Sequence, residues 1–244
     1  MRGAFYYPWY PSHWQEAAGR TPILGQYDSI DVKLSRIHAT QMAWGGVEIA
    51  ICSWWGRGTE SDIGTQAFLY SGKGIVKTVF HYELEIDQDF SSNLDYLKNI
   101  SRQSGYFLYG SRPVLFIYRS WDPAVAAVAT EIASAKGWYV ITQATGGHSQ
   151  YSYTVPSSHF AVVSGKSISC SPGFWRAGEA SPVVVRDMAA FRNALLWAEA
   201  TRAAGWPWQL LISWNEIMEG SQIEPMIGED GEALRVLHEV WGNY

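Results

Sequence analysis

Short apolar runs recur along the chain, and segments with helical spacing lie between them. The runs cover residues 3–7, 47–53, 75–81, 113–118, 138–142, 160–163, 167–171 and 209–214. Most of them are nearly continuous rather than alternating, which is typical of strands that are buried on both faces of a parallel sheet. The pattern therefore predicts strands that alternate with helices.

Five segments predict the helices. Two of them carry apolar stripes at helical spacing, formed by Ile30, Leu34, Ile37 and Trp44 and by Phe90, Leu94, Leu97 and Ile100. A third has Asp122 as its cap and Pro123 in its first turn, ends at Gly137, and has a stripe of Val125, Val128 and Ile132. Residues 188–204 and 231–241 supply the other two.

Eight strands that alternate with helices in 244 residues predict an α/β fold, a (β/α)₈ barrel of the TIM type. A doubly wound open sheet is the alternative. Only residues 164–166 separate the sixth and seventh runs, whereas a parallel crossover needs about a dozen residues. We therefore expect a barrel that is shortened or irregular around strands 5–7, or a run there that is not a barrel strand. Without a linker or repeat, we expect one domain over residues 1–244.

The composition narrows the class of partner. A net charge of −5 without a basic block argues against nucleic acid, and no apolar run of 18 residues predicts a membrane span. The 13 Trp and 14 Tyr residues suit stacking on sugars, although an aromatic-rich core would also account for them. We expect a monomer.

The two cysteines and the first residues bear on the compartment. Cys52 and Cys170 lie in strands that are not neighbours, so we expect two free, buried thiols. Residues 3–8 are too short and too aromatic for the apolar region of a signal peptide. The chain therefore looks cytoplasmic as synthesised, but a virion component or a piece of a longer secreted protein would look the same.

The candidate chemistry lies where the last strand ends, because barrel active sites form at the carboxyl ends of the strands. Glu216 and Glu219 stand three residues apart, a spacing that can bring both carboxyls to one opening. Two carboxyls in unlike environments can serve as base and acid, as the cleavage of a glycosidic bond requires. Two solvated surface glutamates are the alternative.

Other strand ends offer sugar contacts. Glu83 follows an apolar strand, where it would accept hydrogen bonds from sugar hydroxyls or be tied to an arginine such as Arg119. Trp54 and Trp55 point in opposite directions if their strand continues, so one of them would face the pocket. The scattered histidines and two distant cysteines show no spacing for a metal, and no nucleotide motif occurs, so we expect no metal and no cofactor.

Taken together, these motifs resemble glycoside hydrolase family 99, whose members are (β/α)₈-barrel endo-acting α-mannosidases and α-1,2-mannanases. The matches are Phe-Tyr-Tyr-Pro-Trp-Tyr at 5–10, Pro-x-Leu-Gly-x-Tyr-x-Ser at 22–29, Ser-Trp-Trp-Gly at 53–56, His-x-Glu at 81–83 and Asn-Glu-x-x-Glu-Gly-x-Gln-Ile-Glu-Pro at 215–225. Ser-Pro-Gly-Phe at 171–174 resembles the family's Gly-Pro-Gly-Tyr. They follow the family's order along most of the chain.

The resemblance implies roles for individual residues. Glu216 would be the base that draws a proton from the sugar 2-hydroxyl, which attacks its own anomeric carbon to give a 1,2-anhydro intermediate. Glu219 would protonate the leaving oxygen and then activate water, with net retention. The expected sugar contacts are Tyr7, Trp9, Trp54, Trp55, His81, Glu83, Tyr118, Phe174, Asn215 and Glu224. No cofactor is implied.

The departures from the family pattern affect the expected substrate. Met218 stands where the family has a histidine, and Leu84 and Glu85 replace a Pro-Tyr pair. The chain is also shorter between strands five and seven, where the family places part of its sugar-binding wall. The substrate would be an α-linked oligo- or polysaccharide such as mannan. A related barrel acting on α-1,3-glucan and a non-catalytic sugar-binding module are the alternatives, and the two carboxylates argue against the second.

Overall fold

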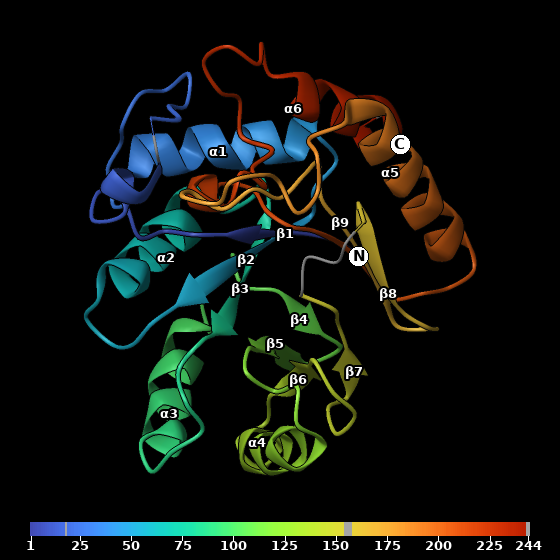
Figure 1. Ribbon diagram of the computed structural model, residues 1–244. Helices are drawn as coiled ribbons and strands as arrows, with labels where there is room; N and C mark the ends of the chain where they lie inside the picture. Colours follow the sequence, from blue (N-terminus) through green and yellow to red (C-terminus); the bar gives the residue numbers. More distant parts are fainter. Residues whose placement is uncertain (18, 154–157, 243–244) are drawn as a thin grey trace.

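The computed structural model describes residues 1–17, 19–153 and 158–242. A ten-stranded sheet curls into a nearly closed barrel with strand order β7-β6-β5-β3-β2-β1-β10-β9-β8 (Figure 1). The parallel strands are β1 (Arg2–Tyr6), β2 (Ile49–Trp54), β3 (Lys77–Tyr82), β5 (Arg112–Ile117), β6 (Tyr139–Thr142), β7 (Ser149–Gln150), β9 (Ser167–Cys170) and β10 (Trp208–Leu211). The predicted TIM-type barrel is confirmed.

The helices lie on the outside of the barrel (Figure 1). They are α1 (Val32–Trp44), α2 (Glu60–Ser71), α3 (Phe90–Ile100), α4 (Pro123–Ala135), α5 (Met188–Ala203) and α6 (Glu232–Leu237), with short turns η1 (Trp14–Ala17), η2 (Ile217–Glu219) and η3 (His238–Gly242). The carboxylate of Asp122 accepts a hydrogen bond from the Ala124 N–H, so the predicted cap of α4 is confirmed. No helix in the described ranges is long and apolar enough to cross a membrane.

The irregular part of the barrel lies where the sequence predicts it. β8 (Phe160–Val163) runs antiparallel to β9, so its three-residue connection is a hairpin turn, closed by a hydrogen bond from Lys166 N to Val163 O (2.9 Å). The run 160–163 is therefore not a barrel strand. Its expected place is taken by the two-residue β7, which pairs with β6 and which the sequence pattern did not predict. Another short strand, β4 (Leu108–Tyr109), pairs antiparallel with β5.

Two of the predicted helix stripes are wrong. In α1, Ile37 and Trp44 are exposed, and in α4 Val125 and Val128 are exposed. The residues that α1 and α4 bury are mostly small or polar, namely Leu34, Ser35, His38, Ala39 and Met42 in α1 and Ala126, Ala129 and Ala133 in α4. Small side chains let these helices lie close to the sheet, so the larger apolar residues remain outside. The stripe of α3 is confirmed, because all four of its residues are buried.

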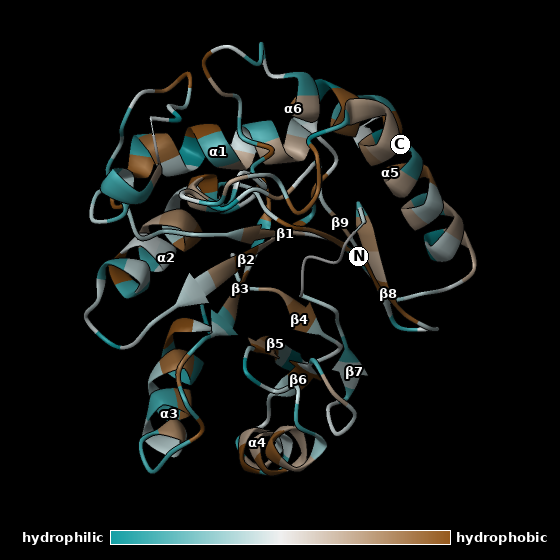
Figure 2. Cartoon of the chain, viewed as in Figure 1, coloured by the Kyte–Doolittle hydropathy of each residue, from teal (hydrophilic) through white to brown (hydrophobic). Residues whose placement is uncertain are grey.

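Helix α2 was not predicted, because its buried face is largely polar. Ser61, Asp62 and Thr65 are buried in it together with Phe68. Asp62 accepts a hydrogen bond from the indole of Trp54 (2.9 Å), so a polar contact takes the place of an apolar stripe. Figure 2 shows hydrophobic and hydrophilic bands alternating around the helices, as expected of elements with one buried side.

Aromatic rings fill the inside of the barrel. The ring of Phe5 on β1 lies 5.0 Å from His81 and 6.1 Å from Phe116, between centroids. It also contacts Tyr151 (5.8 Å) and Tyr153 (4.8 Å), which follow β7. Many of the aromatic residues therefore belong to the core, and the rings around Phe5 lie beneath the carboxyl ends of the strands. Cys52 and Cys170 are free and buried, as predicted.

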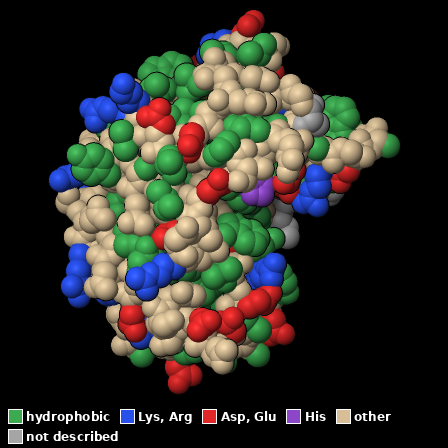
Figure 3. All heavy atoms as spheres, turned by 90° about the vertical axis from the view of Figure 1, so that its left-hand side faces the viewer, with side chains coloured by type: hydrophobic (Ala, Val, Ile, Leu, Met, Phe, Trp, Pro, Cys, Tyr) green, Lys and Arg blue, Asp and Glu red, His purple; other side chains and the backbone are tan. Residues whose placement is uncertain are grey.

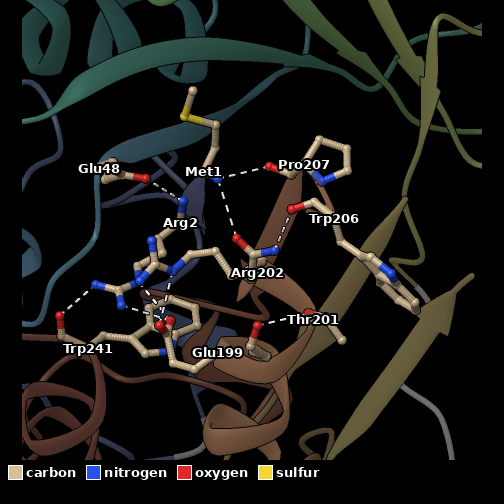
Figure 4. Close-up of polar contacts among 11 residues, drawn as sticks. Met1, Arg2, Glu48, Glu199, Thr201, Arg202, Trp206, Pro207 and Trp241 are labelled. Carbon is tan, nitrogen blue, oxygen red and sulfur yellow. Dashed lines mark hydrogen bonds and ion pairs between the residues drawn. The ribbon is translucent and has the colours of Figure 1, made fainter. Parts of the chain in front are cut away.

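The opposite end of the barrel is tied together by Arg2 (Figure 4). Its guanidinium donates hydrogen bonds to Glu199 on α5 (2.9 Å) and to the carbonyl of Trp241 in η3 (2.6 Å). Its backbone N–H donates to Glu48, just before β2 (2.7 Å). These contacts join the first strand to the last helices at the end of the barrel that lies away from the candidate site.

Candidate active site

Glu216 and Glu219 lie on the turn that follows β10, and the side chain before them fixes this turn to β1. The Asn215 amide accepts a hydrogen bond from Tyr7 N (2.8 Å) and donates one to Tyr7 O (3.0 Å). The Glu216 N–H donates to Ser213 Oγ (2.8 Å). The turn thus stands at the carboxyl ends of the strands, on the side that Figure 3 views, where acidic side chains are interspersed with hydrophobic ones.

Glu216 is buried next to other carboxyls. Burial raises its pKa well above the ordinary value of 4.5, and the charges of Glu219 and Glu83 raise it further. The hydroxyl of Tyr153 donates a hydrogen bond to Glu216 Oε2 (3.1 Å), which acts in the opposite direction by stabilising the carboxylate. Glu216 is therefore a carboxyl that holds its proton to higher pH than an exposed glutamate does.

Glu219 has a cationic neighbour. Arg176, in the loop after β9, forms an ion pair with Glu219 Oε1. The Glu219 side chain is 12% exposed and that of Arg176 is 59% exposed, so the guanidinium covers the carboxyl from the solvent side. The two glutamates are thus in unlike environments, one buried among carboxyls and the other paired with an arginine.

A wall of rings and hydrogen-bonding groups faces the pair. His81 lies with Nδ1 3.0 Å from Glu83 Oε1, and its Nε2 is 2.9 Å from the Tyr151 hydroxyl. The ring of Tyr118 contacts His81 and Tyr153. Burial raises the pKa of Tyr118, and the negative charges of Glu83, Glu216 and Glu219 raise it further.

Glu83 is not tied to Arg119. Arg119 forms its ion pair with Glu85 on the rim, and that alternative for Glu83 is wrong. Glu83 is 4% exposed and faces the histidine at the end of the same strand. The structure therefore leaves Glu83 inside the ring of side chains that surrounds the carboxylate pair.

Tyr7, Trp9 and Trp55 lie on one side of the opening. The rings of Tyr7 and Trp9 are 4.5 Å apart between centroids. Trp9 and Trp55 line a cavity of about 430 Å³ together with Ser12, His13, Thr59, Glu60 and Ser61. Trp55 is 39% exposed and its indole donates a hydrogen bond to Ser53 Oγ (2.9 Å), so its ring is both accessible and fixed.

Three of the expected sugar contacts lie behind this surface. Trp54 is fully buried between the sheet and α2, since it points to the opposite face from Trp55. Asn215 is fully buried in the contacts with Tyr7 described above. Glu224 is 1% exposed and binds His38 (3.0 Å) and the Tyr27 hydroxyl (2.7 Å) through its two oxygens. These residues support the site from within the protein.

Three side chains at the site were not predicted from the sequence, namely Tyr151, Tyr153 and Arg176. The two tyrosines follow β7, whose two residues are too few to give a strand pattern. The alternation Tyr-Ser-Tyr at 151–153 was the available signal. Phe174, which was expected, is half-buried, and the Arg176 guanidinium lies 5.8 Å from its ring centroid. No group of His, Cys, Asp or Glu in the described part of the chain is arranged to hold a metal.

The raised pKa of Glu216 predicts an effect on stability. The stabilisation from a neutral Glu216 is fully present below the pKa of an unfolded glutamate and is lost as pH rises through the raised pKa of the folded state. Glu216→Gln stays neutral at every pH. At about pH 8 it is therefore expected to be more stable than wild type, by about 1.4 kcal/mol for each unit of the pKa shift, whereas at about pH 4 the two proteins should be equally stable. Urea denaturation at both pH values measures this.

Glu85→Gln is the matched control, because the Glu85 side chain is 69% exposed. It should change the free energy of unfolding by a similar small amount at both pH values. Equal stabilities of Glu216→Gln and wild type at the higher pH would contradict the placement of Glu216 in a buried, acidic environment.

Comparisons with known proteins place the fold. No protein-family model matches the chain, and no curated protein matches its sequence. Two structures of the GH99 endo-alpha-mannosidase from Bacteroides thetaiotaomicron match it over 97% of this chain and 95% of theirs. The structure in complex with BIS-TRIS-propane has a TM-score of 0.79 and 20% identity, and the other has a TM-score of 0.77 and 19% identity. A glycoside hydrolase-like protein matches with a TM-score of 0.67 and 16% identity, over 100% of this chain and 94% of its own. The chain therefore has the fold of the GH99 endo-α-mannosidase.

Proposed function

We propose that this protein is a retaining, endo-acting glycoside hydrolase that cleaves α-mannosidic linkages in a polysaccharide or glycan. The observation that carries the proposal is the pair Glu216 and Glu219, which stands in unlike environments at the open end of a barrel with the GH99 fold. A base and an acid at one opening are what the cleavage of a glycosidic bond requires.

The first step uses the pair with one proton on it. Glu216 takes the proton of the sugar 2-hydroxyl, and its buried position makes it a stronger base than an exposed carboxylate. The 2-oxygen forms a bond to C1 as the bond from C1 to the leaving oxygen breaks. Glu219 gives its proton to that oxygen. The products are a shortened glycan and a 1,2-anhydro sugar.

The second step reverses the proton movements. Water attacks C1 and gives a proton to the Glu219 carboxylate, while the bond between C1 and the 2-oxygen breaks. Glu216 returns its proton to the 2-oxygen. Both carboxyls are then as they were at the start, and two inversions at C1 give net retention of the α configuration.

Side chains around the pair would hold the sugar. Glu83 would accept hydrogen bonds from hydroxyls, and the exposed face of Trp55 would stack on a ring. The hydroxyl of Tyr7 is buried and has no hydrogen-bond partner within the described residues, so a bound sugar would supply one. His81 and Tyr118 complete the wall opposite the pair.

Product analysis on a panel of glycans tests the proposal. Wild type is incubated with yeast-type α-mannan, α-linked manno-oligosaccharides and α-1,3-glucan, and the products are separated by size. The proposal is supported if short α-mannosides are released from the mannan and the manno-oligosaccharides and no product is released from the glucan. Products from the glucan alone would assign a different α-glycan, and saturable binding without any product would assign a sugar-binding module.

A further inference from the structure

Tyr27, in the motif at 22–29, has no part in the mechanism above, although its hydroxyl contacts the turn that carries the carboxyl pair. Tyr27 is 8% exposed and lies in the loop between η1 and α1. Building on the proposed function, we infer that Tyr27 is a positioning residue for the base Glu216. Its hydroxyl lies between Glu224 and Asn215, and it acts by fixing the Asn215 side chain, which directly precedes the base.

The direction of each hydrogen bond in this group follows from the backbone of Tyr7. Its N–H can only donate, so the end of the Asn215 amide that it meets is the oxygen Oδ1 (2.8 Å). The other end is therefore the nitrogen Nδ2, which donates to Tyr7 O (3.0 Å) and to the Tyr27 hydroxyl oxygen (3.3 Å). The Tyr27 proton is left free for Glu224 Oε2, to which the hydroxyl donates (2.7 Å).

The surroundings of Tyr27 keep its hydroxyl protonated and in place. Burial raises the pKa of Tyr27 well above the ordinary value of 10, and the negative charge of Glu224 raises it further. The ring lies edge-on to Trp14 (4.9 Å between centroids) and to His38 (5.1 Å). The Trp14 indole also donates a hydrogen bond to the carbonyl of Tyr27 (2.8 Å). The hydroxyl is thus held as a proton donor to Glu224 and an acceptor for Asn215.

Glu224, which accepts the Tyr27 proton, is fixed from two other directions. Its Oε1 lies 3.0 Å from Nε2 of His38 on α1, and Nδ1 of His38 lies 3.1 Å from the hydroxyl of Tyr6 on β1. Its backbone N–H donates to Trp214 O (2.9 Å), just before Asn215. The support of Asn215 therefore extends through Tyr27 and Glu224 to the first strand and the first helix.

The orientation of Asn215 affects the base because the two residues are adjacent. The hydrogen bonds from Asn215 to Tyr7 hold the turn against β1, and the contact with Tyr27 holds the amide from its other side. Without the Tyr27 hydroxyl, one hydrogen of this buried amide loses its acceptor, and Glu216 is held less firmly. A misplacement of about 1 Å in a reacting group can lower a rate by about 10²-fold.

Tyr27→Phe tests this inference on an α-mannoside substrate, since it removes the hydroxyl and keeps the ring. It is expected to lower kcat by about 10–10²-fold and to leave KM within a few-fold of wild type. KM should change little because Asn215 and Glu224 already occupy the Tyr27 hydroxyl. Glu224→Gln keeps an acceptor for the Tyr27 proton, so it should retain more of kcat than Tyr27→Phe does.

Tyr106→Phe is the matched control for loss of a buried tyrosine hydroxyl. Tyr106 is 3% exposed, and its hydroxyl donates to Val114 O (2.6 Å) and accepts from Phe80 N (3.1 Å). It bridges to Thr78 near the start of β3, at the end of the barrel away from the carboxyl pair. Both variants should be less stable to urea than wild type, but Tyr106→Phe should keep its kcat. Equal changes of kcat in the two variants would overturn the inference.

NMR of the Asn215 side-chain amide tests the contact without any substrate, with Asn215→Asp to assign the signal. In Tyr27→Phe the amide hydrogens are expected to exchange with solvent about fivefold faster, the factor that corresponds to one hydrogen bond. Tyr106→Phe should leave this exchange unchanged. Faster exchange with no cleavage by wild type would support the hold of Tyr27 on Asn215 and contradict the proposed function. Unchanged exchange with normal kcat in Tyr27→Phe would overturn the inference and leave the proposed function intact.

Discussion

Replacing Glu216 with glutamine is expected to lower kcat on an α-mannoside substrate by about 10²–10⁴-fold. Glutamine has the shape of glutamate but cannot take the proton from the 2-hydroxyl, so the anhydro ring does not form. KM should stay within a few-fold of wild type, since the side chain is buried at 6% exposure and the amide keeps its packing. Initial rates over a range of substrate concentrations separate the two constants.

Glu219→Gln should give a similar loss on a natural linkage, but for a different reason. An aryl glycoside with a good leaving group needs no proton from Glu219. The first step of Glu219→Gln should therefore recover on that substrate, whereas the first step of Glu216→Gln should not. Glu85→Gln, on the same rim but outside the pair, is the control and should match wild type. Normal turnover by Glu216→Gln would contradict the role of Glu216 as the base.

The largest effect on stability is expected from Gly46→Ala. Gly46 lies between α1 and β2 with φ of 82°, a conformation that L residues rarely adopt. A Cβ there would also lie 2.5 Å from the carbonyl carbon of Trp241 and 2.9 Å from its Cβ, where η3 closes on the start of β2. Strain and overlap together should lower the free energy of unfolding by about 3–5 kcal/mol. Urea denaturation measures it.

Gly205→Ala separates the two contributions. Gly205 lies in the equivalent connection between α5 and β10 with φ of 85°, and a Cβ there would meet nothing within 4 Å. It should therefore show the strain alone, about 1–2 kcal/mol. Equal losses in the two variants would contradict the close contact between η3 and residue 46.

The sequence predicts the barrel well because its parallel strands are buried on both faces. Nearly continuous apolar runs such as residues 47–53 are visible without knowledge of the strands that pair with them. Helix faces were harder to predict, because α4 packs through Ala126 and Ala129 and leaves Val128 outside. Hydrophobicity alone ranks the valine first, whereas the close approach of helix and sheet favours the alanines. The two-residue β7 is set by its partner β6 and has no pattern of its own.

Part of the candidate site could likewise be predicted from the sequence, and part could not. Glu216 and Glu219 stand in one contiguous motif, so their spacing was informative before any fold was known. Tyr153 and Arg176 reach the pair from two other loops, and only the closed barrel brings them there. The burial of Glu224 could not be predicted from the sequence either, because Glu224 belongs to the same motif as the pair and yet turns inward to His38.

NMR of the anomeric protons of freshly released products tests whether this protein cleaves α-mannosidic linkages with net retention. Wild type is mixed with an α-1,2-linked manno-oligosaccharide, and spectra are collected before mutarotation mixes the anomers. We expect oligosaccharides from internal cleavage to appear first in the α configuration, and Glu216→Gln to release none. Products that appear first in the β configuration, or equal release by Glu216→Gln, would contradict this mechanism.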